Sequence, residues 1–535
     1  MGREGPPTDT SPRSSWRFWL FPLVGLTATA WILFLVGFWV DYLLAPGPGR
    51  GLFATLFGYD TETIQNSLAN LAQAIAAILG IAITVVSIIV QLAATRYTPS
   101  VAEMFFRDRT NLAVLSFFVI AGTYAMWVAV AVSRDVLPRV SITVTMIFLT
   151  TSLMLLVPYF AYVFDFMDPG KVIARIRDQA VLSARARTRA KRRASLQETQ
   201  HNVLAAIEQL ADIGVNAVSQ KDRGIAAGVT NALMGLATLY LREKASLEPS
   251  WFEIGPELRK NPDFVAMTDE SLRDLGAKKT WVEFKILRQF ETLFGDSVKE
   301  MRDVARVVAI NTRYIGEAAL RAGDREVLVL VTKFFNTYLR VTINTAEVRT
   351  AYNVLNQYRL LVENVLRFGW DEIALEFAKH LSYYGQLAQS RGLGFVTETA
   401  AYDLCALCET AFSVRSKYQD AMLRVFLEVD RESESAEQEL ALRGVRKAQV
   451  KLATFYLLQG ATELARAIQE DMATEKAERL ASIRDELMAI TTKDFWEVID
   501  RGSNFDYLEP ERKERLATFF SWFPQLKGGS PTNPG

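Results

Sequence analysis

The sequence predicts an all-α, polytopic membrane protein with four transmembrane helices and a large cytoplasmic helical domain, built as a bundle or an irregular solenoid. Three observations lead to this fold class. Four long apolar stretches lie in the first third of the chain. Half of the 535 residues are apolar. The more polar remainder is rich in helix-forming residues and repeats its apolar positions every three or four residues.

The four apolar stretches are each longer than the about 20 residues that a helix needs to cross a bilayer. They cover approximately residues 16–44, 66–95, 111–132 and 140–164, within a transmembrane domain at 16–168. Arginines precede the first stretch and a dense basic run follows the fourth. Because Lys and Arg gather on the cytoplasmic side, we expect a cytoplasmic tail at 1–15 and both termini in the cytoplasm.

Small and polar residues form a stripe along one face of the second span. They recur every three or four residues, the spacing of a single helical face, and comprise Asn70, Gln73, Gly80, Thr84, Ser87 and Gln91. Side-chain amides in hydrocarbon are costly unless they meet a partner or water, so this face is not expected to face lipid. Two interpretations stay open: a helix-packing seam, or the lining of a wet path between several subunits.

A short elbow follows the second span. Tyr97 and Pro99 interrupt the apolar run, since proline disfavours helix at the residue before it and permits a new helix to start. A short apolar face and the charged cluster Arg107, Asp108 and Arg109 follow. This pattern indicates an amphipathic elbow on the inner leaflet or a plain connector between spans.

A basic juxtamembrane helix is expected at 169–199. Its candidate contacts to anionic lipid headgroups are Arg185, Arg187, Arg189, Arg192 and Arg193. The alternative is that these arginines act only as a topology signal on a solvated helix.

Residues 200–525 are predicted to form the cytoplasmic helical domain, followed by a disordered tail at 526–535. Val203, Ile207 and Leu210 begin one helical stripe. Another, from Val327, follows Asp324 as a plausible N-cap. The segment 451–472 indicates a helix, a Gln-Gly turn and a second helix, although no second copy with a clear period is evident.

Little material for catalysis or metal binding is visible. The chain has two cysteines and two histidines. Cys405 and Cys408 form a CxxC without a second pair or a nearby histidine, and we interpret them as a buried helical pair. We expect no metal, no cofactor and no enzymatic activity. Basic and acidic residues number 60 each, which gives no case for a nucleic-acid partner.

Two blocks of the sequence resemble a known family. Residues 85–125 contain Gln91-Leu92-Ala93, the aromatic-Thr-Pro elbow, the charged cluster and Gly122-Thr123-Tyr124; the second block is residues 207–236. Both are similar to the bacterial predicted-membrane-protein family catalogued as domain of unknown function 2254. One departure is Lys221-Asp222-Arg223, where the family usually has an Asn-Asp-Pro turn. The resemblance implies a four-span bacterial inner-membrane protein with a cytoplasmic domain, and it supplies no catalytic residues.

The function expected from the sequence is that of a homo-oligomeric, channel-like or transport-associated inner-membrane protein. In this interpretation the stripe on the second span lines a water-accessible path. The alternative is a membrane-anchored scaffold or sensor whose cytoplasmic helical domain binds a protein partner. In both interpretations the lipid bilayer is an expected partner of the protein.

Overall fold

The computed structural model describes residues 25, 28–29, 31–40, 43, 61–96, 99–132, 138–186, 193–429, 436–494, 501 and 504–526. These residues form helices and the turns between them, with no β-strand among them, which confirms the all-α fold class. The chain divides into two compact units, Met1–Arg175 and Ile176–Gly535, which we call the membrane unit and the helical unit.

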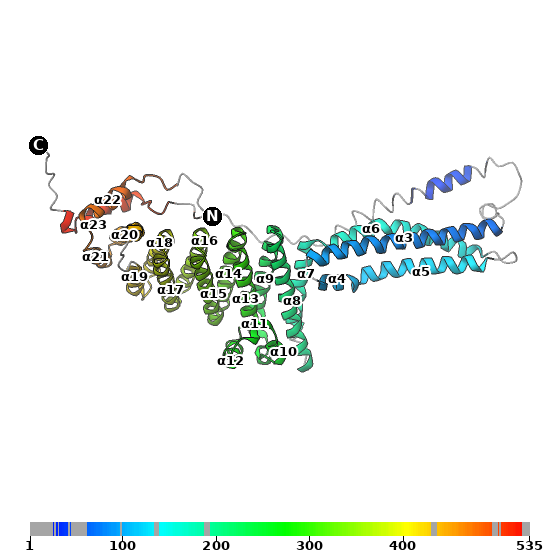
Figure 1. The fold of residues 1–535 in the computed structure, drawn as a ribbon, viewed down its shortest axis with the longest axis horizontal. Helices are drawn as coiled ribbons and strands as arrows, with labels where there is room; N and C mark the ends of the chain where they lie inside the picture. The colour runs from blue at the N-terminus through cyan, green and yellow to red at the C-terminus, as the bar shows by residue number, and fades with distance from the viewer. Residues whose placement is uncertain are drawn as a thin grey trace. The chain divides into compact units, whose positions relative to one another are not determined.

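Three long helices make up most of the described membrane unit. They are α3 (Thr61–Arg96), α5 (Arg109–Ala131) and α6 (Arg139–Phe166), and they match the second, third and fourth predicted spans. The short α4 (Pro99–Phe106) joins α3 to α5, and α7 (Pro169–Ala186) follows α6. Each of the three long helices contacts the other two, and they lie side by side in Figure 1.

The first predicted span, 16–44, lies largely outside the described residues. Within it, Trp31–Val40 is a short apolar helix. At 36 residues, α3 is roughly 54 Å long at about 1.5 Å per residue, which exceeds the ~30 Å hydrocarbon core.

Aliphatic side chains hold the three long helices together. Ile64 and Leu68 of α3 pack with Val128, Val132 and Ile142 in one cluster. A second cluster joins Ile75 of α3 to Ala121 and Ala125 of α5, where the small alanines let the two helices approach closely. The side of α3 that packs within the unit is therefore apolar along its length.

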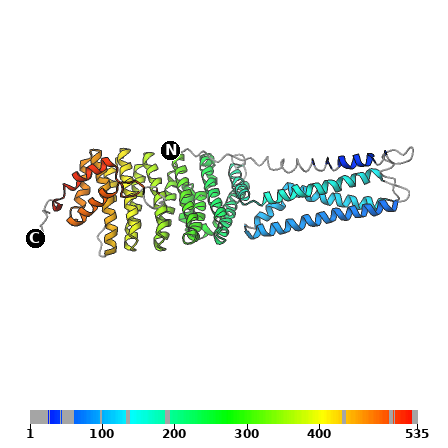
Figure 2. The same cartoon turned by 90° about the horizontal axis from the view of Figure 1, so that it is seen from above.

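The helical unit is a two-layered stack of helical hairpins. One layer contains α8 (Arg193–Ser219), α13 (Trp281–Ser297), α15 (Arg325–Asn344), α17 (Asp371–Ser390), α19 (Gln419–Leu427) and α21 (Thr462–Asp471). The other contains α9 (Arg223–Glu243), α14 (Arg302–Ala322), α16 (Val348–Arg367), α18 (Gly394–Ser413) and α20 (Ala436–Leu458). Each helix contacts its neighbours in its own layer and at least one sequence-adjacent helix in the other. This nearest-neighbour pattern, visible in Figure 2, is that of an α-solenoid rather than a closed bundle.

The middle of the stack repeats with a regular period. Helices α14, α16 and α18 begin at residues 46 apart, and so do α15 and α17. The turns after α14 and α16 each contain a glycine with positive φ, Gly323 at +70° and Gly369 at +83°. This left-handed conformation ends a helix and suits glycine, which lacks a Cβ. The equivalent turn after α18 uses Arg415 at φ +57°. The sequence alone did not reveal this repeat.

Three helical segments expected from the sequence are confirmed, the last of them a pair of helices. Val203, Ile207 and Leu210 are buried on α8. The Asp324 side chain caps α15 by accepting a hydrogen bond from the Val327 amide at 3.1 Å. Helix α20 ends at Leu458 and α21 begins at Thr462, with Gly460 at φ +77° in the turn between them.

A fourth helix in the described residues is long and apolar enough to cross a membrane. It is Arg223–Ser246, which comprises α9 and the short turn η2 (Lys244–Ser246). Burial explains its composition, because α9 lies between α8 and α14 and half of its apolar window is buried. The Lys244 ammonium at its end pairs with Glu283 of α13 at 2.9 Å and with Asp324, the N-cap of α15, at 2.7 Å.

A small insertion separates α9 from the regular repeats. It contains α10 (Pro256–Arg259), α11 (Pro262–Val265) and α12 (Asp269–Ala277). The buried ammonium of Lys285 on α13 holds it in place, with Asp263 at 2.6 Å, Asn261 at 2.8 Å and Glu208 at 3.1 Å. Charge neutralisation and three hydrogen bonds compensate the burial of this lysine.

Glutamates recur at one position of the repeat. Glu317, Glu363 and Glu409 are 46 residues apart. The first two pair with Arg313 and Arg359, each one turn earlier on the same helix. At the third position Cys405 stands in place of the arginine, and Arg512 of α23 (Pro510–Phe520) binds Glu409 instead, at 2.7 and 3.1 Å.

The two cysteines are buried within the stack of helices. Cys405 and Cys408 are free thiols, only 2% and 0% exposed, on α18. Burial raises the pKa of both thiols above the ordinary value. They form the buried helical pair that was predicted, and the described residues contain no group of His, Cys, Asp and Glu that could hold a metal ion.

Replacing Arg512 with glutamine is expected to destabilise the helical unit. The change leaves the partly buried Glu409 carboxylate without its bidentate partner, at a cost of roughly 2 kcal/mol. Thermal unfolding of the full-length protein followed by circular dichroism measures the loss. Lys379→Gln is the matched control, because the Lys379–Glu376 pair is exposed and contributes little. Equal melting temperatures for the two variants would contradict this role of Arg512.

Candidate functional site

The polar stripe predicted on the second span lies on the outer face of α3. Within the described residues, Asn70, Gln73, Gly80, Thr84, Ser87 and Gln91 are all exposed. The buried residues of α3 occupy the other side and are aliphatic: Ile64, Leu68, Ile75, Ile78, Ala82, Val86 and Val90. The stripe is therefore not a packing seam against α5 or α6 of the same chain.

Side chains of the stripe satisfy only part of their hydrogen-bonding capacity within the helix. The Thr84 hydroxyl donates to the Gly80 carbonyl at 2.8 Å. A Cβ placed on Gly80 would meet nothing within 4 Å, so the backbone there is open to close approach by another helix. The amides of Asn70, Gln73 and Gln91 have no such local bond among the described residues. A carboxamide needs up to four hydrogen bonds, which lipid tails cannot supply.

Gln73 also borders a groove on the side of the unit. The groove lies between α3 and α5 and has a volume of about 540 Å³. Its other lining side chains are mainly apolar, with Thr123 of α5 as an exception. The amide of Gln73 is thus the chief polar group at this edge of the stripe.

The elbow is fastened to the rest of the unit by a compact cluster. We call it the elbow cluster, and it comprises Phe105, Asp108, Asn111, Tyr159, Tyr162 and Phe166. Phe105 of α4 is fully buried, and its ring lies 5.2 Å from that of Phe166 at the end of α6. Val101, one turn earlier, is also buried. The apolar face predicted for the elbow thus packs inside the unit, while Phe106 stays exposed.

Asp108 is the centre of the elbow cluster. Its carboxylate caps α5 by accepting hydrogen bonds from the amides of Thr110 at 2.8 Å and Asn111 at 3.4 Å. The Tyr162 hydroxyl donates to the same oxygen. Burial alone would raise the pKa of Asp108, but these hydrogen bonds outweigh it and hold the pKa below the ordinary value.

Asn111 extends this network into the unit. Its side-chain amide donates to the Phe105 carbonyl at 3.3 Å, and its oxygen accepts from the Tyr159 hydroxyl at 2.7 Å. Tyr159 and Tyr162 therefore bind the start of α5 to the end of α6. Neither tyrosine was predicted as a site residue, although their three-residue spacing near the end of an apolar span indicates a shared helical face.

The remaining elbow residues have simpler surroundings. Pro99 is the first residue of α4, and Tyr97 lies outside the described residues. Arg107 forms an exposed ion pair with Glu103 at 2.6 Å. Arg109 is the exposed first residue of α5.

The predicted lipid-contact arginines fall where the structure describes little. Arg187, Arg189 and Arg192 lie outside the described residues. Arg185 is near the end of α7 and Arg193 begins α8, but their side chains are not among those described. The proposed headgroup contacts of this run stay a prediction.

Part of the chain matches a known protein family. Residues 15–225 match the family DUF2254, described as predicted membrane proteins. This match confirms the resemblance inferred from residues 85–125 and from the block at 207–236. Together with the long apolar helices it identifies a multi-pass membrane protein. Comparison with curated proteins and with solved structures gave no match.

Replacing Asp108 with alanine is expected to lower the melting temperature of the membrane unit. The loss of an N-cap costs about 1 kcal/mol, and the Tyr162 hydroxyl loses its acceptor as well. Because the pKa of Asp108 is lowered in the fold, its stabilisation is complete above the ordinary pKa of 3.8 and declines as the pH falls below it. The difference from the unmodified protein should therefore narrow in acid.

Thermal unfolding of the protein in nanodiscs at several pH values measures both effects. Glu103→Ala is the matched control, since it removes only the exposed Glu103–Arg107 ion pair next to Asp108. A pH-independent difference, or a loss no larger than that of the control, would contradict the role given to Asp108.

Proposed function

We propose that the protein is a homo-oligomeric channel in which the polar stripe of α3 lines a water-accessible path. The observation that carries the proposal is the two-sided character of α3. Its aliphatic side packs within the unit, and its amides and hydroxyls face outward with no cover from the described residues.

Unsatisfied polar groups explain why the outward face calls for other subunits. An amide left in hydrocarbon costs several kilocalories per mole, and three amides share this face. Copies of α3 placed around a common axis would hydrate the amides in a shared path. Gly80 and its small neighbours leave room for such an approach. The stripe carries no charge, which favours a path of low intrinsic ion selectivity.

The proposed placement is the bacterial inner membrane with both termini in the cytoplasm. The basic residues before the first span and after the fourth support this orientation. In this orientation the helical unit lies in the cytoplasm. We also infer that the protein is not an enzyme, and that the elbow cluster keeps the cytoplasmic end of the spans fixed.

Cysteines placed on the stripe are expected to react with a charged, membrane-impermeant thiol reagent in intact vesicles. Gln73→Cys, Thr84→Cys and Gln91→Cys test three depths of the path. Ile81→Cys and Ile88→Cys are matched controls, because these residues are 53% and 52% exposed on the same helix but off the stripe. The native cysteines are buried, so they give little background. Equal protection of stripe and control positions would contradict the wet path.

Ion flux through liposomes containing the purified protein tests conduction directly. Ser87→Leu and Gln91→Leu replace polar lining with apolar side chains and are expected to abolish the flux, because a dewetted segment blocks ions. Ile88→Leu, one residue away, should conduct normally. Oligomer size and thermal stability are checked for each variant. Flux that persists in both stripe variants would exclude this face as the conduction path.

A second candidate function rests on the helical unit. Solenoids offer long continuous surfaces that bind other macromolecules, and the stack of hairpins is of this type. We propose, as the alternative, a membrane-anchored scaffold or sensor whose helical unit binds a protein partner. Protected stripe cysteines together with the absence of flux would favour it over the channel.

A further inference from the structure

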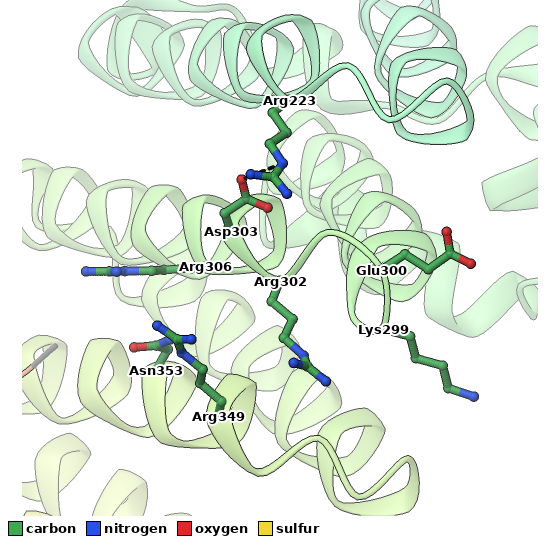
Figure 3. Close-up of a pocket in the computed structure, with 8 residues that line it drawn as sticks. All are labelled: Arg223, Lys299, Glu300, Arg302, Asp303, Arg306, Arg349 and Asn353. Atoms are coloured by element: carbon green, nitrogen blue, oxygen red, sulfur yellow. Dashed lines mark ion pairs between the residues drawn. The ribbon is translucent and has the colours of Figure 1, made fainter. Parts of the chain in front are cut away.

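A basic pocket lies at one edge of the solenoid, where three helices of the same layer begin. Its lining side chains are Arg223, Lys299, Glu300, Arg302, Asp303, Arg306, Arg349 and Asn353, and its volume is about 340 Å³ (Figure 3). Arg223 is the first residue of α9, Arg302 the first of α14, and Arg349 the second of α16. The pocket belongs wholly to the helical unit and is separate from the stripe on α3.

Positive charge dominates the pocket. Five basic side chains face two acidic ones, although the chain as a whole is neutral. The amino ends of α9, α14 and α16 add the partial positive charge of their helix dipoles. Crowding of like charges is unfavourable unless an anion compensates it.

The two acids are already matched by other cations. Asp303 pairs with Arg223 at 3.3 Å, the contact drawn in Figure 3, and Glu300 pairs with Lys221 at 3.0 Å outside the pocket. Arg302 binds Glu347 at 2.8 Å. Lys299 and Arg349 have no carboxylate within ion-pair distance among the described residues. The pocket thus keeps cationic groups that no described acid neutralises.

Asn353 provides an independent indication of a ligand. It is only 7% exposed, yet its side chain lines the pocket and has no hydrogen bond to any described residue. Its amide atoms are not among the fully buried atoms that lack a partner, so they are open to the pocket, where a ligand or water can bind them. Asn353 lies one turn after Arg349 on α16, and Figure 3 shows the two side chains next to each other, near Arg306 of α14.

We propose that this pocket binds a small phosphate-bearing ligand. Guanidinium groups match phosphate oxygens with paired, charge-assisted hydrogen bonds, and Arg349 offers such a group beside the Asn353 amide. The Asn353 amide can donate to the same group, and the helix amino ends favour its negative charge. The volume is in the range of small-ligand sites and accommodates a phosphate with an attached group. The phosphate comes from a soluble metabolite or from a lipid headgroup.

Binding of inorganic pyrophosphate to the full-length protein in zwitterionic nanodiscs tests the soluble source, by isothermal titration calorimetry. Arg349→Gln and Asn353→Leu are each expected to weaken binding about tenfold, the effect of losing one hydrogen bond to a charged group. Arg325→Gln is the matched control, because Arg325 is an exposed arginine at the start of α15, beyond the opposite end of α14. It should bind as the unmodified protein does.

Cosedimentation with phosphatidylinositol-phosphate vesicles, compared with phosphatidylcholine vesicles, tests the lipid source with the same variants. Loss of either binding in the two pocket variants, but not in Arg325→Gln, supports the proposal and identifies the source. Circular dichroism verifies that each variant is folded. Absence of both kinds of binding, or binding that the pocket variants leave unchanged, overturns it.

Discussion

A helix in a bilayer satisfies its own backbone, but it cannot do the same for the amide side chains that it carries. This constraint governs the membrane unit. The side of α3 that packs on α5 and α6 contains aliphatic residues, from Ile64 to Val90. The side that carries Asn70, Gln73 and Gln91 is left without cover by the described part of the chain. The described part of the chain therefore leaves a polar surface without cover, and the proposed oligomeric path would supply the water or neighbouring helices that such a surface needs.

Polar contacts within the membrane unit gather instead at one end of the bundle. Asp108 and Asn111 bind the two tyrosines of α6 where α4, α5 and α6 meet. Directional hydrogen bonds fix the relative position of helices more strictly than aliphatic packing does. The three helices are thus held rigidly at the elbow and by softer apolar contacts along the rest of their length.

Local patterns in the sequence predicted much of this fold. Apolar length identified the second, third and fourth spans, and the Asp324 cap and the turn at Gly460 marked individual helices. The repeat was not predicted, because helix length and turn position preserve its period, whereas only a few residues, such as Glu317, Glu363 and Glu409, keep their identity. Cys405 occupies the repeat position of Arg313 and Arg359, and Arg512 of the distant helix α23 binds Glu409 in place of the missing arginine.

Contacts between residues that are far apart in the sequence could not be predicted either. The insertion after α9 interrupts the spacing of the hairpins and obscures the period. Tyr159 and Tyr162 are about fifty residues from the elbow that they secure. In the basic pocket, Arg223 and Arg349 come from helices that are neighbours only after the hairpins stack. Local periodicity does not indicate which distant residues come into contact in the folded protein.

The regular 46-residue stacking of α14, α16 and α18 has a mechanical consequence. In a stack where the hairpins pack mainly on their nearest neighbours, small rotations at successive interfaces add up along the stack. Such a structure behaves as a spring along its axis. A force applied to one hairpin is shared among all the interfaces of the helical unit, and each of them deforms only slightly.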